Sequence, residues 1–347
     1  MSNAAIKNIS DVLRSGYVGE GAKVKQFEQE VETLFGYKGI KVVNSATSAL
    51  ELACQMIGIK PGDEVITTPI TCTATQTGIL LYGASLVWAD VDPETGLIDP
   101  KDVQRKITKK TKAIIGVNWG GAMCDWDTLN SFGIPTIEDA AHGSYWSTKT
   151  RGNYVVWSFG PIKHLTSGDG GALLSPDPDR ARLLRWHGLD RESKADFRCS
   201  QNITEVGRKL HMNDINATIG LANIKHLTSI VSGFNYRARL YDTGIVNPKI
   251  KKPVYSTTNP FWLYTIRSDT RDDLSKYLFD KGIASSQVHA RNDKHDAFIR
   301  ASKFGRTVHN DSLPGTDTFD DTQLSIPVGN WISYKDVQYI IEVLNGY

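Results

Sequence analysis

The chain has 347 residues, of which 40% are hydrophobic and 22% are charged, as in an ordinary soluble globular protein, and its length indicates about two domains. Its 40 lysines and arginines nearly balance 38 aspartates and glutamates. The net charge of +2 argues against a nucleic acid or an acidic membrane as partner, so small molecules are the expected ligands.

An amphipathic helix over 22–36 opens the predicted fold, with Gly36 as its C-cap. Short apolar runs then alternate with helical patterns. The expected strands are 40–43, 64–67, 86–88, 113–117, 135–138 and 155–158, and the expected helices between them are 46–57, closed by Gly58, and 76–81. This rhythm predicts an α/β fold with a mostly parallel central sheet and flanking helices. Ligands bind such sheets at the carboxyl ends of the strands.

The pattern changes in the second half of the chain. Helices are predicted over 213–226, entered through Asn213 or Asp214, and over about 235–241. They are followed by a strand at 262–267, a helix at 272–281 stopped by Gly282, a polar loop and a final helix at 333–344. We therefore expect an N-terminal arm (1–21), a large domain (22–225) and a small C-terminal α+β domain (226–347).

The four cysteines and the N-terminal sequence indicate the cellular compartment in which the protein is expected. Cys54, Cys72, Cys124 and Cys199 form no C-x-x-C pair, so neither a zinc site nor a redox motif is predicted, and no bound metal is expected. We interpret them as reduced thiols. No apolar signal-peptide core and no run of about 18 apolar residues is present, so a cytoplasmic protein without a membrane partner is expected.

Residues 44–50 join a strand to a helix whose first turn is small and rich in hydroxyl groups, including Thr47 and Ser48. The first backbone N–H groups of a helix have no partner within the helix and can hold an anion. The alternative is an ordinary Ser or Thr N-cap, which is the more common case for such a segment alone.

The apolar strand at 135–138 ends in Glu138 and Asp139, followed by two alanines and His142. An acid at a strand's carboxyl end, beside small residues, leaves room for a flat ligand. Alternatively, Asp139 caps a following helix and His142 is a satisfied surface or core residue. The segment alone leaves both interpretations open.

A lysine, Lys163, follows the strand at 155–158 and precedes a glycine-rich turn at 168–171. Most lysines are solvated surface groups. A lysine held between a strand end and a tight turn can, however, acquire the depressed pKa and the fixed approach that a reactive amine needs. The glycine-rich stretch matches neither a P-loop nor a dinucleotide fingerprint.

Together, these three segments supply what a pyridoxal phosphate site requires: a lysine that reacts with the aldehyde, an acid for the ring nitrogen and amides for the phosphate. Asp139 as a carboxylate would keep the ring nitrogen protonated, so that the ring can accept electrons. Lys163, once released, can carry the substrate proton.

On these motifs the sequence resembles the DegT-type nucleotide-sugar aminotransferases, a family of fold type I pyridoxal phosphate enzymes, over nearly the whole chain. The resemblance is carried by an ordered set of segments: 15–18 (SGYV), 44–47 (NSAT), 61–66 (PGDEVI), 90–92 (DVD), 107–114 (ITKKTKAI), 138–142 (EDAAH), 163–171 (KHLTSGDGG) and 211–214 (HMND). The set is specific, whereas each member alone is weak.

The resemblance implies roles for individual residues. Lys163 would bind the cofactor covalently, Asp139 would face the ring nitrogen and His142 would lie beside the ring hydroxyl. Thr47, Ser48 and Ser158 would bind the phosphate, Cys72 would line the cofactor pocket, and Lys209 would meet the phosphate of a neighbouring subunit. In related sugar dehydratases a histidine replaces the lysine; here Lys163 is retained and is followed by His164. Transamination is therefore favoured over dehydration.

Three departures from the family pattern affect this interpretation. Cys72 stands where relatives often have an aromatic residue, and it could equally be a small core residue. Lys209 lies in a segment where relatives carry Asn and Arg, and a solvated surface lysine is the alternative. Asn118 begins a stretch, 118–121, that replaces a more usual histidine-containing one.

The polar loop of the second domain contains His289, Arg291 and His295. Arg and His suit recognition of a nucleotide diphosphate. We interpret them instead as solvated loop residues and do not assign them to the site.

The expected function is therefore a homodimeric aminotransferase with shared active sites, cycling between pyridoxal and pyridoxamine phosphate. It would move an amino group from L-glutamate to a nucleotide-linked keto-deoxy sugar, as in the synthesis of GDP-perosamine for surface polysaccharides. The sugar carrier, the choice between C3 and C4 ketones, and cyclitol ketones stay open. Two alternatives are a pyridoxal-dependent dehydratase or epimerase of the same fold and a non-catalytic sugar-nucleotide sensor.

Overall fold

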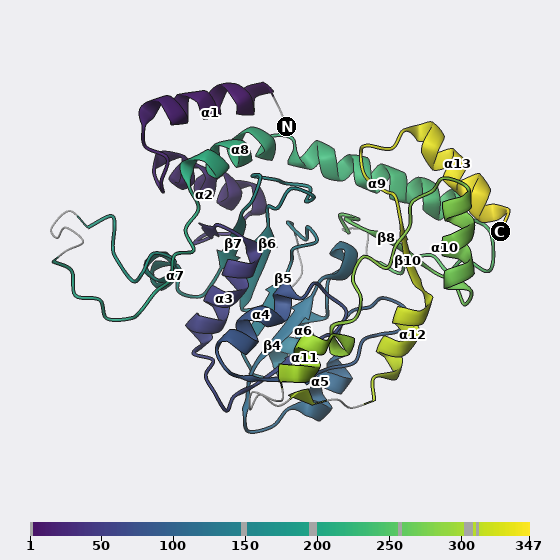
Figure 1. Cartoon of the computed structure of the whole chain (residues 1–347), viewed down its shortest axis with the longest axis horizontal. Coiled ribbons are helices and arrows are strands. Elements are labelled where there is room, and N and C mark those ends of the chain that lie inside the picture. Colours follow the sequence, from purple (N-terminus) through teal and green to yellow (C-terminus); the bar gives the residue numbers. More distant parts are fainter. Residues whose placement is uncertain (1–2, 147–150, 194–199, 256–258, 302–307, 310–311) are drawn as a thin grey trace.

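The computed structural model describes residues 3–146, 151–193, 200–255, 259–301, 308–309 and 312–347. Helices surround a central sheet, and most of the last third of the chain gathers beside it (Figure 1). Within the described ranges, no helix combines the length and the apolar character needed to cross a membrane.

Within the described residues, the central sheet has eight strands in the order β1-β7-β6-β5-β4-β2-β3-β9. Their bounds are β1 Lys41–Val43, β2 Glu64–Thr67, β3 Ser85–Trp88, β4 Thr111–Val117, β5 Thr136–Asp139, β6 Tyr154–Ser158, β7 Gly171–Leu174 and β9 Val308–His309. Strand β7 runs antiparallel to its neighbours, β1 and β6, and the other pairs of these described strands are parallel. The carboxyl ends of β4, β5 and β6 therefore meet at one edge of the sheet.

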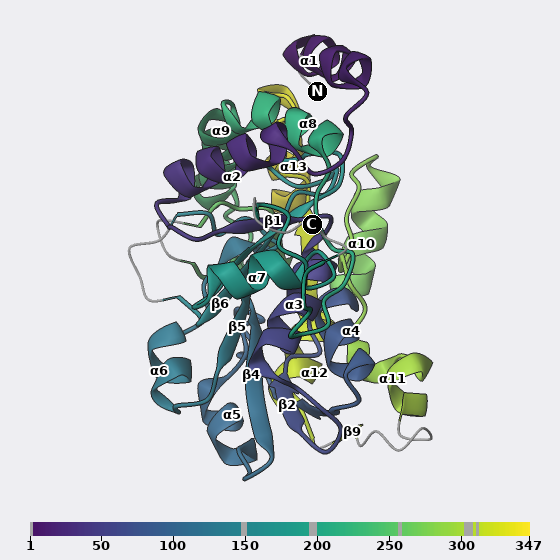
Figure 2. The same ribbon diagram turned by 90° about the vertical axis from the view of Figure 1, so that its left-hand side faces the viewer.

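Successive strand residues pack on opposite faces of the sheet, because side chains alternate along a strand. Val156 shares a core with α3 (Ala46–Ile57), α4 (Ala74–Leu81) and α7 (Pro178–Leu184). Its neighbour Val155 shares another with α2 (Ala22–Phe35) and α8 (Asp214–Ile224). On β2 to β4, α5 (Pro100–Lys106) and α6 (Trp126–Ser131) pack against a third core, and α1 (Asn3–Ser15) packs on α8 (Figure 2).

The C-terminal part has its own core and a two-stranded antiparallel sheet of β8 and β10. Its elements are α9 Leu227–Gly244, β8 Tyr264–Arg267, α10 Arg271–Asp280, α11 Asp296–Ala301, α12 Pro314–Thr322, β10 Gln323–Ile326 and α13 Tyr334–Asn345. Short 3₁₀ turns, η1 Trp119–Gly121 and η2 Asn292–Lys294, precede α6 and α11. The division into an arm, a large domain and a small domain stays a prediction.

The structure confirms the predicted fold class, and the long amphipathic segments lie where they were expected. Helix α3 has the predicted bounds, and Gly36 and Gly58 end α2 and α3 in the left-handed conformation. Residues expected to form only an arm contain α1, and α9 is longer than the predicted 235–241. Ser229 and Gly233 are weak helix formers, so the sequence pattern did not predict the first turns of α9. The short elements β7, β9, β10, α5, α6, α7, α11 and α12 were not predicted.

Candidate active site

Asp139 is the last residue of β5 and is only 4% exposed. Its Oδ2 accepts a hydrogen bond from Thr75 Oγ1 at 2.9 Å, and its Oδ1 accepts one from the Ala141 amide at 3.1 Å. Burial raises the pKa of the carboxyl group, while these hydrogen bonds and the nearby Lys163 oppose the rise. Residues 140–146 form no helix, so Asp139 is not an N-cap, and that alternative is wrong.

The neighbouring carboxylate, Glu138, has a structural role instead, because other residues of the protein occupy its hydrogen-bonding positions. It points to the other face of β5 and receives hydrogen bonds from Asn118 Nδ2 at 2.7 Å, Arg151 Nε at 3.0 Å and the Gly152 amide at 2.9 Å. Asn118, one of the departures from the family pattern, is fully buried and makes this contact with its side-chain amide. Because side chains alternate along β5, Asp139 points to the face opposite Glu138, at the strand end where a ligand is expected.

Lys163 lies in the loop after β6, close enough to Asp139 for the two charges to interact. Burial lowers the pKa of the lysine from 10.5 to about 8, while Asp139 and Cys72 oppose the change. An exposed lysine is almost wholly protonated at neutral pH. The amine of Lys163 consequently has a larger neutral, nucleophilic fraction.

His142 lies in the turn after β5 and is 4% exposed. Its Nδ1 accepts a hydrogen bond from the Gly120 amide at 3.1 Å, so the neutral ring carries its proton on Nε2. Burial, with the charges of Lys163, His289 and His164, holds the pKa of His142 well below its usual range. The ring is therefore a neutral donor at physiological pH.

The start of α3 and the end of β6 form the third part of the group. Ser45 is the N-cap of α3, and its Oγ accepts from the Ser48 amide at 3.1 Å. Ser158 pairs with Gly171 on β7, and a Cβ on Gly171 would lie 2.5 Å from the Ala46 nitrogen. The helix start thus packs directly on Gly171, beside Ser158. Thr47 and Ser48 occupy the first turn of that helix, as predicted.

Replacing Gly171 with alanine is expected to push the start of α3 away from β7. We expect the free energy of unfolding to fall by about 1–3 kcal/mol and phosphate-containing ligands to bind more weakly, because overpacking displaces backbone. Thermal melting and a titration with pyridoxal phosphate measure the two effects. Gly19→Ala is the matched control, since a methyl group there meets no atom of the described residues within 4 Å. Equal affinities in the two variants would contradict the role of Gly171.

Two of the expected site residues, Cys72 and Lys209, have exposed side chains. Cys72 is exposed, one residue before the N-cap of α4, and interacts electrostatically with Lys163, so it is not a core residue. Lys209 is exposed on a segment that pairs with Trp186, and its expected phosphate belongs to a second subunit; its role stays a prediction. Of the other cysteines, Cys54 and Cys124 are buried free thiols, and Cys199 lies outside the described residues.

The C-terminal part adds two residues that sequence reasoning missed. Trp262 stacks on His142 with ring centres 4.1 Å apart, and His289 lies half-buried 6.3 Å from the same ring. His289 is thus not a solvated loop residue. Arg291 is not solvated either: it is 7% exposed and pairs with Asp293 and Asp317. No sequence signal marked Trp262, since it lies about 100 residues after Lys163 in the chain.

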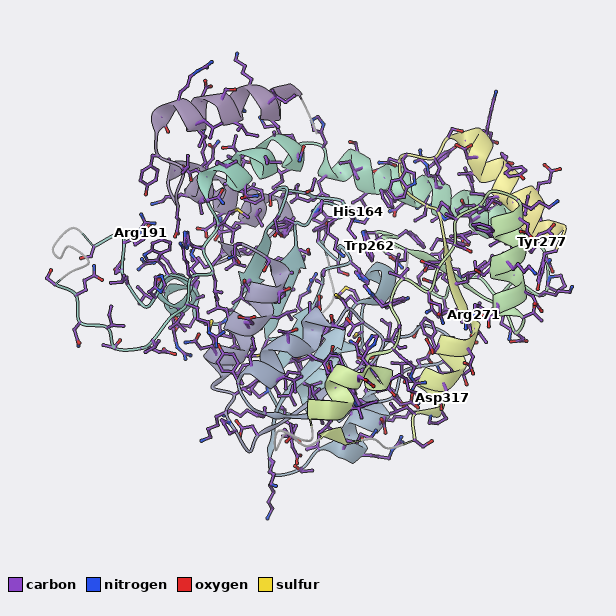
Figure 3. The ribbon with its side chains drawn as sticks, viewed as in Figure 1. His164, Arg191, Trp262, Arg271, Tyr277 and Asp317 are labelled. Carbon is purple, nitrogen blue, oxygen red and sulfur yellow. The ribbon has the colours of Figure 1, made fainter. Side chains whose placement is uncertain are left out.

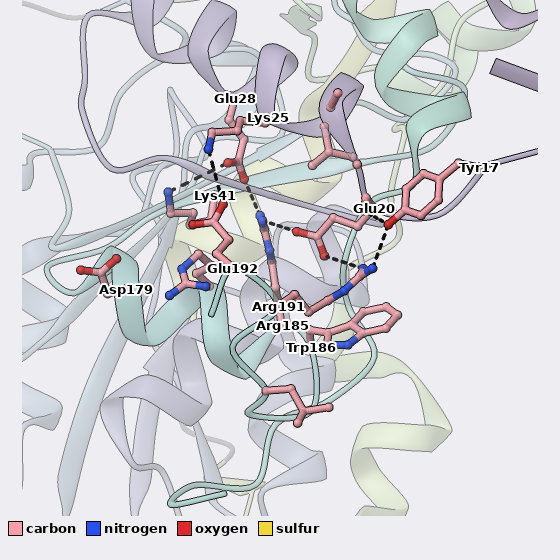
Figure 4. Close-up of a pocket in the computed structure, with 15 residues that line it drawn as sticks. Tyr17, Glu20, Lys25, Glu28, Lys41, Asp179, Arg185, Trp186, Arg191 and Glu192 are labelled. Atoms are coloured by element: carbon pink, nitrogen blue, oxygen red, sulfur yellow. Dashed lines mark hydrogen bonds and ion pairs between the residues drawn. The ribbon is translucent and has the colours of Figure 1, made fainter. Parts of the chain in front are cut away.

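A separate polar pocket of about 400 Å³ lies between the N-terminal segment and α7 (Figure 4). Its lining includes Tyr17, Arg185 and Arg191 but not Lys163, Asp139 or His142. Glu20 and Glu28 both pair with the buried Arg185, so its charge is already compensated. The candidate active site is accordingly the group around Lys163.

Known proteins match the chain over nearly its full length. The model of the DegT/DnrJ/EryC1/StrS aminotransferase family matches residues 1–345. The spore coat polysaccharide biosynthesis protein SpsC of Bacillus subtilis is 33% identical, over 98% of this chain and 93% of the relative. The sugar aminotransferase CalS13 of Micromonospora echinospora is 32% identical with a TM-score of 0.91, over 100% of this chain and 97% of that chain.

A further relative bears on the cofactor. Spr1654 of Streptococcus pneumoniae has been solved in a PLP form that is 25% identical to this chain, with a TM-score of 0.87, over 100% of this chain and 96% of that chain. It has also been solved in a PMP form. The chain belongs to the DegT/DnrJ/EryC1/StrS family and is a pyridoxal phosphate-dependent aminotransferase.

Proposed function

We propose that the protein transfers an amino group from L-glutamate to the ketone of a nucleotide-linked keto-deoxy sugar, as in the conversion of GDP-4-keto-6-deoxymannose to GDP-perosamine. The observation that carries the proposal is the buried carboxylate of Asp139 at the end of β5, with the buried amine of Lys163 nearby in the loop after the adjacent strand β6. A sugar acceptor is supported by the names of CalS13, a sugar aminotransferase, and SpsC, a polysaccharide biosynthesis protein.

The residues present fit pyridoxal phosphate. A buried carboxylate is costly without a cationic partner, and a protonated ring nitrogen is such a partner for Asp139. The first amides of α3, with Thr47, Ser48 and Ser158, offer donors to a phosphate. His142 would donate from Nε2 to the ring hydroxyl, and the thiol of Cys72 would lie at the pocket wall.

Bound pyridoxal phosphate would supply the electron sink for breaking the donor's Cα–H bond. Side chains of the protein would bind the cofactor and move the protons. Nζ of Lys163 would hold the cofactor and, once free, would accept and return the proton, for which a pKa near neutrality is well matched. Asp139, through Oδ, would keep the proton on the ring nitrogen. These assignments place all proton handling on residues of β5 and the loop after β6.

The first test follows the visible absorption band of the purified protein. Adding L-glutamate alone is expected to bleach this band toward that of the pyridoxamine form, because the donor half-reaction needs no acceptor. Adding 2-oxoglutarate should restore it. Keto-sugar nucleotides are then screened for the same restoration. An absorption band that does not change on addition of glutamate would favour the alternative function, a pyridoxal-dependent dehydratase. A protein that binds no cofactor would contradict the proposal.

The proposal includes the assembly and the setting. A homodimer with shared active sites gives Lys209 a phosphate to bind in the partner subunit. Cytoplasmic sugar nucleotides are the expected acceptors, and the three-part division at residues 21 and 225 places the chemistry in the large domain. Cross-linking and light scattering measure the oligomeric state.

A further inference from the structure

Trp262 precedes β8 in the C-terminal part of the chain (Figure 3), yet its indole ring lies against Lys163 and His142 of the candidate active site. The centre of its indole ring is 3.6 Å from Nζ of Lys163. The same indole stacks on the His142 ring at 4.1 Å, with 28° between the planes. One half-buried side chain therefore contacts both groups.

The position of the indole is restrained both by a hydrogen bond from its ring nitrogen and by the backbone turn that precedes Trp262. Its Nε1 donates a hydrogen bond to the carbonyl oxygen of Ile162, the residue before Lys163, at 3.1 Å. The preceding residue, Phe261, has a φ of +52°, an unfavourable conformation for a bulky side chain. Phe261 is nonetheless 4% exposed and donates its amide to Asn259 Oδ1 at 2.8 Å. Packing thus holds a strained turn that directs Trp262 toward the site.

The same segment is anchored on the large domain's side of the site. Gly121, directly after the residues that contact His142, has a φ of +100°. A Cβ there would lie 2.6 Å from Cγ of Pro260 and 2.9 Å from Oδ1 of Asn259. The chain before Trp262 therefore packs directly on this glycine. This close approach restrains the backbone that leads into Trp262.

We propose that Trp262 is a positioning residue, whose indole holds the amine of Lys163 and the ring of His142 in fixed places at the edge of the sheet. The proposal rests on the role of Lys163 under the proposed function. Trp262 would act through these two residues, and it links the C-terminal part of the chain to the group that carries the chemistry.

The contact has a consequence for the protonation of Lys163. An aromatic face attracts an ammonium cation but not a neutral amine, so the indole favours the protonated form, whereas burial favours the neutral one. The other groups facing the amine come from several elements: Asp139 at the end of β5, Cys72 before α4, His142 after β5, His289 in the C-terminal loop and His164 next in the chain.

The test compares Trp262→Phe with Trp262→Leu in the full-length, cofactor-free protein. Both variants are apolar and both lose the indole N–H, but only Phe keeps an aromatic face. Lysines are acetylated with trace acetic anhydride between pH 6 and 10, and the extent at Lys163 is measured by peptide mass spectrometry. We expect the midpoint of the Lys163 profile to lie about half a pH unit or more lower in the Leu variant.

The exposed Lys225 in the same digest is the internal control, and its profile should not differ between the variants. Trp262→Met replaces the Leu variant if circular dichroism shows that the latter does not fold. Equal midpoints in folded variants would overturn the proposal. A separate measurement tests the proposed function, on which this inference rests. If borohydride reduction of the cofactor-loaded protein attaches the cofactor to a lysine other than Lys163, the proposed function is wrong, whatever the acetylation profiles show.

Discussion

The Lys163→Ala variant is expected to lose amino-group transfer by about 10³-fold or more, because it removes both the covalent anchor and the group that moves the proton. Turnover with L-glutamate and a keto-sugar nucleotide measures the loss. Borohydride reduction followed by peptide mapping should fix the cofactor at residue 163 in the unchanged protein and at no single site in the variant. Lys225→Ala, at an exposed position outside the site, should retain full activity.

A second variant, Lys163→Met, separates chemistry from stability. The folded pKa of about 8 lies below the unfolded value of 10.5, so the unfolded chain binds more protons and stability rises with pH between these values. Below pH 8 the buried amine costs on the order of 3 kcal/mol. The cofactor-free Met variant, which keeps the apolar stem, should therefore melt at a higher temperature than the unchanged protein at pH 7, and the difference should shrink toward pH 10. A pH-independent difference would contradict the burial of the amine.

The grouping of Lys163, Asp139 and His142 could be predicted because the carboxyl ends of neighbouring parallel strands meet at one edge of a sheet. Asp139 ends β5 and Lys163 follows β6, which pair directly. Strand alternation places Glu138 on the face opposite Asp139, in agreement with the prediction of Asp139 alone as the acid of the site.

Trp262 and His289 could not be found in this way. Their positions depend on how a later part of the chain packs against the sheet, and no periodic pattern encodes that contact. The turn at Phe261 opposes the local backbone preference, so only tertiary packing holds it. Gly171 is a similar case: its neighbours explain a β7 glycine only once the start of α3 is seen against it. Strongly periodic elements were predictable, and contacts between distant segments were not.

The Asp139→Asn variant is expected to change activity and stability in opposite directions. Turnover should fall about 10²- to 10³-fold, because the amide cannot balance the charge of a protonated ring nitrogen. In the cofactor-free protein, the carboxyl's raised pKa means that its stabilising contribution is present below its unfolded pKa and is lost as the pH rises through the folded value. At neutral pH the buried charge is a cost, whereas an asparagine can still pair with Thr75 and the Ala141 amide.

The melting temperature of cofactor-free Asp139→Asn should therefore equal or exceed that of the unchanged protein at pH 7, while its activity is lost. Thr75→Val is the matched control, because it removes a hydrogen bond to the same carboxylate without removing the charge. That variant should lower stability and reduce turnover less than Asp139→Asn does. If Asp139→Asn instead unfolded the protein and Thr75→Val left it active and stable, Asp139 would be a structural anchor like Glu138, and the ring nitrogen would need another partner.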